Sequence, residues 1–163
     1  MEPTAGNNQI LARTVLEAEI GSRIKSNRNY IGLVAGDTGS GKSWSSIRIA
    51  EMLSPSFTPD NIVFDTISFI RVLKRLTSQA GGKGQFIIYD EAGSDLSARR
   101  SMSETNVQMS AILEMLRFTL VNVLFTVPSV KQADINISRL AHGHIVAEAI
   151  DRARCPPDRK SVV

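Results

Sequence analysis

The chain has 163 residues, of which 42% are hydrophobic and 21% charged, a composition that is typical of one folded domain and excludes a disordered or fibrous protein. Nineteen Lys and Arg against 16 Asp and Glu give a net charge of +3, which allows a polyanionic partner without requiring one. The single cysteine, Cys155, excludes an internal disulfide, and the lack of a secretion signal or of an apolar run of about 20 residues predicts a cytoplasmic chain without a membrane span.

The first predicted elements surround a glycine-rich segment. Apolar residues at helical spacing predict a helix over residues 9–25, which the polar residues 26–29 end. The continuous apolar run at residues 30–36 is typical of a strand that is buried on both faces of a parallel sheet. A second helix is expected from about Gly41 to just before Pro55. The residues of this helix expected to face the core are Trp44, Ile47, Ala50 and Leu53.

Strands and helices alternate along the rest of the chain. Apolar spacing between Phe69 and Leu76 predicts a helix that the glycine-rich residues 79–84 terminate, and the capping-box spacing of Ser101 and Glu104 predicts the start of another. Further strands are expected at residues 61–65, 85–93, 122–128 and 144–150. This alternation predicts an α/β fold with a mainly parallel central sheet, flanked by helices and joined by right-handed crossovers.

We expect three segments along the chain. Residues 1–28 form an N-terminal helical segment, residues 29–151 form the core, and residues 152–163, rich in Arg, Pro and Asp, form a tail or a cut end.

The glycine-rich segment carries the strongest motif. It reads GDTGSGKS from Gly36 to Ser43, the G-x-x-x-x-G-K-S pattern of a P-loop, between a buried strand and an amphipathic helix. Glycines let successive backbone N–H groups form an anion site, and the helix N-terminus points its positive end at the phosphates. Lys42 is expected to reach the β- and γ-phosphates of ATP, and the Ser43 hydroxyl to bind Mg²⁺. The residues expected to bind the nucleotide are Gly36, Asp37, Thr38, Gly39, Ser40, Gly41, Lys42, Ser43 and Trp44. A chance glycine-rich turn is the alternative, and the flanking strand and helix disfavour it.

A pair of acids follows the third strand in the stretch FIIYDE. Asp90 comes at the carboxyl end of a strand, where open α/β sheets bind ligands, and is expected to help hold Mg²⁺ as a Walker B aspartate. Glu91 follows at once, and a carboxylate there can orient or deprotonate an attacking water. The alternative is two acids that merely cap the end of a strand, and the neighbouring P-loop disfavours it. The pair favours ATP hydrolysis over a structure that is only stabilised by the nucleotide.

With these motifs, the chain resembles the RecA-like P-loop ATPases of the additional-strand, catalytic-glutamate class, and most of all the FtsK–HerA branch of DNA-pumping motors. That branch includes viral packaging ATPases, conjugation coupling proteins and Zot-like phage proteins. The stretches that carry the resemblance are GDTGSGKS, IIYDEAGSDL and ILEMLRFTLVNVLFTVPSV followed by NISRLAHGHIV, within residues 30–150. The resemblance implies a homo-oligomeric ring, usually a hexamer, with DNA in its pore, and a further strand between the P-loop and Walker B strands.

The resemblance also implies residues that complete the site. Arg117 is the expected arginine finger for the neighbouring subunit, and a solvated residue at a helix end is the alternative; Arg139 is the second candidate, before Arg99 and Arg100. The branch carries a γ-phosphate-sensing glutamine near the end of the fourth strand. This chain has Thr126, Val127 and Pro128 there, and Thr126 is the expected substitute.

We therefore predict a Mg²⁺-dependent ATPase that moves DNA or virion material, encoded by a virus, plasmid or other mobile element of a prokaryotic host. A non-motor ATP switch and a small phosphotransferase are the alternatives. Tyr30 is expected either to stack on the adenine or to be buried at the start of its strand.

Overall fold

A five-stranded, entirely parallel sheet forms the centre of the computed structural model, which describes residues 5–78, 82–90, 116, 118–130 and 135–148. The strand order is β2-β3-β4-β1-β5. The strands are β1 (Ile31–Ala35), β2 (Ile62–Val63), β3 (Phe86–Tyr89), β4 (Asn122–Val127) and β5 (Gly143–Val146). The predicted α/β, RecA-like class with a parallel sheet is confirmed, and β4 lies between the P-loop strand β1 and the Walker B strand β3.

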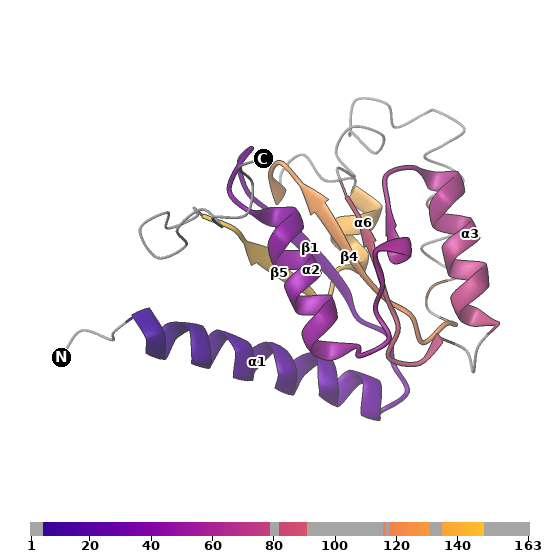
Figure 1. Ribbon diagram of the computed structural model, residues 1–163, viewed down its shortest axis with the longest axis horizontal. Helices are drawn as coiled ribbons and strands as arrows, with labels where there is room; N and C mark the ends of the chain where they lie inside the picture. Colours follow the sequence, from indigo (N-terminus) through magenta and orange to yellow (C-terminus); the bar gives the residue numbers. More distant parts are fainter. Residues whose placement is uncertain (1–4, 79–81, 91–115, 117, 131–134, 149–163) are drawn as a thin grey trace, which may run out of the picture.

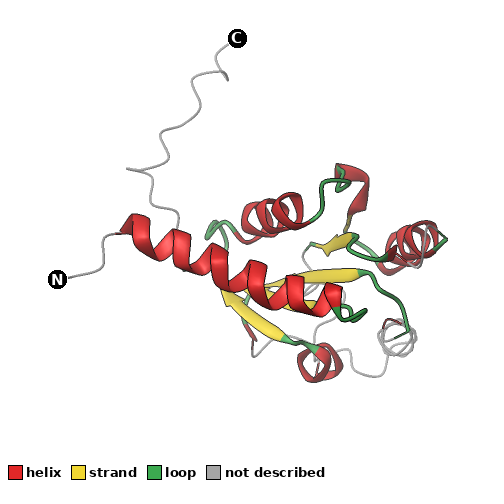
Figure 2. Cartoon of the chain, turned by 90° about the horizontal axis from the view of Figure 1, so that it is seen from below, coloured by secondary structure: helices red, strands yellow, loops and turns green. Residues whose placement is uncertain are grey.

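Helices cover both faces of this sheet (Figures 1 and 2). They are α1 (Ala5–Lys25), α2 (Lys42–Leu53), α3 (Thr66–Thr77) and α6 (Ile135–Leu140), with a short 3₁₀ helix, η1 (Pro59–Asn61), before β2. Helices α1 and α2 pack on one face, and α3 and α6 on the other. None of the helices in the described ranges combines the length and the apolar character of a membrane span.

The two faces are built by alternation along each strand, because successive side chains of a strand point to opposite sides. In β1, Ile31 and Leu33 join the core under α3, whereas Val34 joins the core under α1 and α2. All five residues of β1 are buried, as the continuous apolar run predicted.

Three of the predicted strands are clearly shorter in the structure than in the sequence-based prediction. The strand expected at residues 85–93 is Phe86–Tyr89, and residues 91–93 lie outside the described residues. The strand expected at residues 61–65 is only Ile62–Val63, because Asn61 belongs to η1 and Asp65 caps α3 by accepting a hydrogen bond from the Ser68 N–H. The strand expected at residues 144–150 is Gly143–Val146, and residues 149–150 lie outside the described residues. The predicted tail at residues 152–163 also lies outside them and stays a prediction.

Tyr30 is buried just before β1, at the amino edge of the sheet and opposite the P-loop. A Cβ added to Gly143 would overlap the Tyr30 hydroxyl, and one added to Gly32 would lie 2.8 Å from the ring. These glycines pair in register on β5 and β1 and leave the space that the ring fills. Burial raises the pKa of the Tyr30 hydroxyl, with a further contribution from the charge of Glu19. The buried alternative for Tyr30 is therefore confirmed, and the adenine-stacking alternative is wrong.

The amino edge also contains the side chain that joins three strands. Asn122, at the start of β4, is fully buried. Its amide oxygen accepts a hydrogen bond from the Tyr30 N–H at 2.9 Å, and its amide nitrogen donates to the Gln85 carbonyl at 3.2 Å. A buried polar group with satisfied partners fixes one arrangement of its neighbours, and here it ties β1, β3 and β4 together.

Candidate functional site

The loop between β1 and α2 has the backbone that an anion site needs. Gly39 and Gly41 have φ angles of 81° and 90°, a region that glycine adopts without strain. Gly41 is the N-cap of α2 and offers no side-chain cap to the N–H groups of the first turn. The first N–H groups of a helix have no intrahelical partner and lie at its positive end. The loop therefore presents free donors where phosphate oxygens can bind.

Gly36 begins this loop in a space that only glycine fits. A Cβ at Gly36 would collide with the Ala147 carbonyl and the Ser40 hydroxyl. The Ser40 hydroxyl is buried and, among the described residues, has no hydrogen-bond partner. Within the loop, the Ser40 N–H donates to the Asp37 carbonyl at 3.1 Å.

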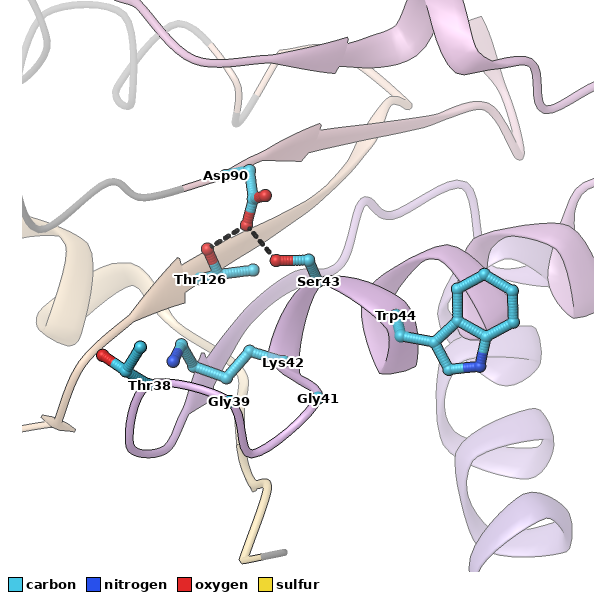
Figure 3. A pocket seen from close by; sticks show the side chains of 8 residues that line it. All are labelled: Thr38, Gly39, Gly41, Lys42, Ser43, Trp44, Asp90 and Thr126. Atoms are coloured by element: carbon cyan, nitrogen blue, oxygen red, sulfur yellow. Dashed lines mark hydrogen bonds between the residues drawn. The ribbon is translucent and has the colours of Figure 1, made fainter. Parts of the chain in front are cut away.

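Lys42 is the first residue of α2, and its side chain extends back across the loop. Its ammonium donates to the Asp37 carbonyl at 2.8 Å, on the side of the loop that faces the cavity (Figure 3). A lysine in this place brings a positive charge next to the backbone donors, as the binding of polyphosphate requires.

Three polar side chains meet at the mouth of the loop (Figure 3). Asp90 Oδ1 accepts one hydrogen bond from the Ser43 hydroxyl at 2.8 Å and another from the Thr126 hydroxyl at 2.6 Å. Ser43 belongs to α2, Asp90 follows β3, and Thr126 lies on β4, so three separate elements build this group. Hydrogen bonds to an ionised carboxylate are about twice as strong as neutral ones, and these two fix the orientation of Asp90.

The strand register explains how these side chains come together. Tyr89 pairs with Phe125 across β3 and β4, so the next residues, Asp90 and Thr126, lie at the same level. Thr126 in turn pairs with Val34, two residues before the P-loop. The Thr126 hydroxyl thus projects between the P-loop and Walker B strands, as expected from the sequence.

A cavity of about 350 Å³ opens at this edge of the sheet. Its lining residues are Thr38, Gly39, Gly41, Lys42, Ser43, Trp44, Asp90 and Thr126, all of which the sequence had indicated. Trp44 lies in the first turn of α2, on the side of the cavity away from Asp90 (Figure 3). Its side chain is 66% exposed, so the prediction that Trp44 faces the core is wrong: Trp44 lies two residues, or about 200°, from the fully buried Ser46 and so points away from the sheet.

These residues fit a nucleotide with its magnesium ion. The cavity falls within the usual range of ligand sites, about 300–1,000 Å³. The Ser43 hydroxyl and the Asp90 carboxylate are hard oxygen donors, and Mg²⁺ sites beside phosphates commonly use one or two such protein groups, with phosphate and water oxygens as the other ligands. Ser43 and Asp90 are therefore the residues that would hold the ion.

The remaining predicted site residues have no described place in this cavity. Glu91, Arg117, Arg99 and Arg100 lie outside the described residues. Arg139 is exposed in the last turn of α6. Three residues later, the His142 N–H donates to the Ile31 carbonyl at the amino end of β1, so Arg139 lies at the opposite edge of the sheet from the cavity of its own chain.

Solved structures share this fold. The N-terminal domain of zonular occludens toxin from Neisseria meningitidis is 18% identical with a TM-score of 0.52, over 73% of this chain and 76% of that one. The FIGL-1 AAA domain in complex with ADP is 17% identical with a TM-score of 0.55, over 90% of this chain and 53% of that one. PCH-2 from C. elegans is 14% identical with a TM-score of 0.59, over 91% of this chain and 45% of that one.

The chain thus spans about half the length of the last two structures. No protein-family model and no curated protein matches the sequence. At these identities the likenesses show the fold, which this chain shares with AAA domains and with the N-terminal domain of a zonular occludens toxin. The assignment to the FtsK–HerA branch stays a prediction.

Proposed function

We propose that this chain binds ATP with Mg²⁺ and hydrolyses it. The observation that carries the proposal is the pair of hydrogen bonds from Ser43 and Thr126 to Asp90, at the mouth of a G-x-x-x-x-G-K-S loop. The ADP complex of one structural neighbour, FIGL-1, supports a nucleotide as the ligand. The sequence indicates no arginine-rich lid that would cover an acceptor substrate, and this disfavours a phosphotransferase.

Each residue has a task in this function. The loop amides and Lys42 bind the phosphates, and Ser43 and Asp90 hold the ion, whose positive charge offsets the negative charge on the transferred phosphoryl group. Thr126 keeps the Asp90 carboxylate oriented and, in this proposal, also senses the γ-phosphate. Glu91, which follows Asp90 directly in the sequence, polarises the attacking water. Arg117 acts on the site of a neighbouring subunit.

We further propose that hydrolysis drives the movement of DNA, or of virion material, by a ring-shaped homo-oligomer. The structural likeness to a zonular occludens toxin domain supports this, because Zot-like phage proteins belong to the branch that the motifs resemble.

The test is ATP turnover by the wild type, Lys42→Ala and Glu91→Gln, each without DNA, with duplex DNA and with single-stranded DNA. We expect turnover that DNA stimulates and that both substitutions abolish, with Glu91→Gln still binding ATP. Wild-type protein that binds ATP but fails to hydrolyse it would contradict the ATPase proposal. Turnover that is indifferent to any nucleic acid would contradict the motor proposal alone.

A second candidate is an ATP-dependent assembly switch with slow hydrolysis. The observation that favours it is the end of β4, where the hydroxyl of Thr126 replaces the expected glutamine and is already bonded to Asp90. Val127, the next residue, is buried and apolar. The switch predicts nucleotide-dependent oligomerisation, measured by analytical ultracentrifugation, with negligible turnover.

A further inference from the structure

Two large apolar side chains are exposed where β2 leads into α3. Phe64 follows β2 and is 61% exposed, and Ile67, in the first turn of α3, is 71% exposed. Single exposed apolar residues are common on protein surfaces and need no explanation. Here two of them lie three residues apart at one tip of the molecule.

The exposed face of α3 continues from this tip as a basic surface. Arg71 and Lys74 follow Ile67 by four and seven residues, so the three side chains lie on one side of the helix, and all three are exposed. Their span is about 10 Å along the helix axis, close to the rise of three nucleotides in a duplex strand. Arg75, the third basic residue, instead bonds to Asn61 and to the Asp60 carbonyl.

The charge of this helix has one sign. The segment Thr66–Thr77 contains three basic residues and no acidic residue. Among the described residues, neither Arg71 nor Lys74 has an ion-pair partner, whereas the exposed Arg48 on the opposite side of the sheet pairs with Glu51 at 3.0 Å. An acid, Asp65, directly follows Phe64 in the sequence. Its pKa is lowered chiefly by the hydrogen bond from the Ser68 N–H, and least by the charge of Arg71.

Exposed aromatic and unpaired basic side chains on one surface are the features by which proteins bind single-stranded nucleic acid. The bases stack on aromatic faces, and the phosphates bind Arg and Lys. We propose that Phe64, Ile67, Arg71 and Lys74 form a binding surface for a single nucleic-acid strand, with a base against Phe64 and phosphates on Arg71 and Lys74. This inference rests on the proposed function, since it identifies the polymer and the surface that holds it.

The surface is connected to the nucleotide site by one hydrogen bond. The Asp90 N–H donates to the Val63 carbonyl at 2.8 Å, and Val63 directly precedes Phe64. The nucleotide site and this surface are therefore adjacent through the paired backbones of β2 and β3. A motor that uses ATP hydrolysis to move a polymer needs such a connection between its ATP site and its polymer-binding surface.

The test is fluorescence anisotropy with labelled oligothymidylate and with a duplex, over a range of salt concentrations. Each lost phosphate contact lowers the slope of log K against log salt by about 0.7 for a single strand. We expect Arg71→Ala/Lys74→Ala to lower the slope by about 1.4 and the affinity at 0.1 M salt by about ten- to thirtyfold. Phe64→Leu should weaken strand binding about fivefold or more and leave duplex binding unchanged, because only an unpaired base can stack. Arg48→Gln, a change of an exposed arginine outside the surface, should have no effect.

Basal ATP turnover without DNA separates this inference from the proposed function. All four residues of the proposed binding surface lie outside the nucleotide cavity, so their variants should keep wild-type basal turnover. An active wild type whose strand affinity and salt slope are unchanged in the double variant, or whose Phe64→Leu variant binds the strand normally, overturns the inference and leaves the ATPase proposal standing. Loss of self-association in place of strand binding, measured by sedimentation, would instead assign the surface to contacts between copies and overturn it too.

Discussion

Replacement of Thr126 by valine removes one hydroxyl from the centre of the site and keeps the side-chain shape nearly unchanged. Thr126 is buried, and its hydroxyl donates to Asp90 Oδ1 over 2.6 Å. A hydrogen bond to a charged group contributes about 1.5–3 kcal/mol net. Asp90 is partly exposed and keeps the Ser43 donor, so we expect a loss of only about 1 kcal/mol in the free energy of unfolding. For a chain of this size that loss lowers the Tm by about 2–4 °C.

The larger effect of Thr126→Val is expected on the use of Mg²⁺. Without this hydroxyl the Asp90 carboxylate is free to rotate away from Ser43, and the ion site loses its preorganisation. We expect the Mg²⁺ concentration for half-maximal ATP turnover to rise about tenfold, which corresponds to about 1.4 kcal/mol. A magnesium titration of turnover measures it.

The same titration distinguishes two roles of Thr126. If Thr126 positions Asp90, half-saturation by Mg²⁺ rises; if it senses only the γ-phosphate, kcat falls and half-saturation stays unchanged. Thr126→Ser keeps the hydroxyl and should behave as the wild type. A valine variant with wild-type Tm, kcat and Mg²⁺ dependence would refute the reasoning, because the shortest hydrogen bond of the site would then contribute nothing.

Three further predictions follow from other parts of the structure. Lys42→Ala should weaken ATP binding at least about tenfold, since it removes a charge-assisted contact. Trp44, the sole tryptophan, lines the cavity, so its fluorescence should change with ATP in the wild type and need at least about tenfold more ATP in this variant. A wild-type signal that ignores ATP would contradict the site. Asp65→Ala should cost about 0.5–2 kcal/mol in unfolding free energy. The folded-state pKa of Asp65 is lowered, so its stabilisation is present above about pH 4 and is lost as the pH falls through the folded-state value; urea midpoints at neutral and acidic pH check this, with Asp65→Asn as the cap that keeps its stability without this titration. Gly143→Ala should cost about 1–3 kcal/mol by forcing the Tyr30 ring to move, and an unchanged urea midpoint would contradict that packing.

The sequence predicted those features of the fold that depend on short-range pattern. Residues 30–36 form a continuous apolar run, and only a strand covered on both faces buries all of them. GDTGSGKS is specific because two of its glycines occupy the left-handed region and Gly36 has no room for a side chain. The position of β4 between β1 and β3 came from the resemblance, since pairing between strands that are distant in sequence leaves no local signal.

Local pattern failed at two exposed aromatic residues. Trp44 precedes Ile47, Ala50 and Leu53 in steps of three residues, each about 60° short of a full turn, so Trp44 ends up opposite the buried face of α2, which contains Ser46 and Ala50. Phe64 likewise seemed part of a strand, yet the chain leaves the sheet after Val63 because Asp65 caps α3. The capping signal could have been read from Asp65 and its position before the apolar helix residues. No local signal could show that Phe64 and Ile67 are exposed together.

The amino edge of the sheet determines whether the site forms at all. Asp90 meets Thr126 only because β3 and β4 pair with Tyr89 level with Phe125. A slip of one residue would turn the side chain at that level to the opposite face, and Thr126 would face away from Asp90. Asn122 opposes such a slip, because its buried amide is bonded both to Gln85, before β3, and to Tyr30, before β1. The residue that secures the nucleotide site thus lies at the far end of β4 from it, where a search for catalytic motifs does not look.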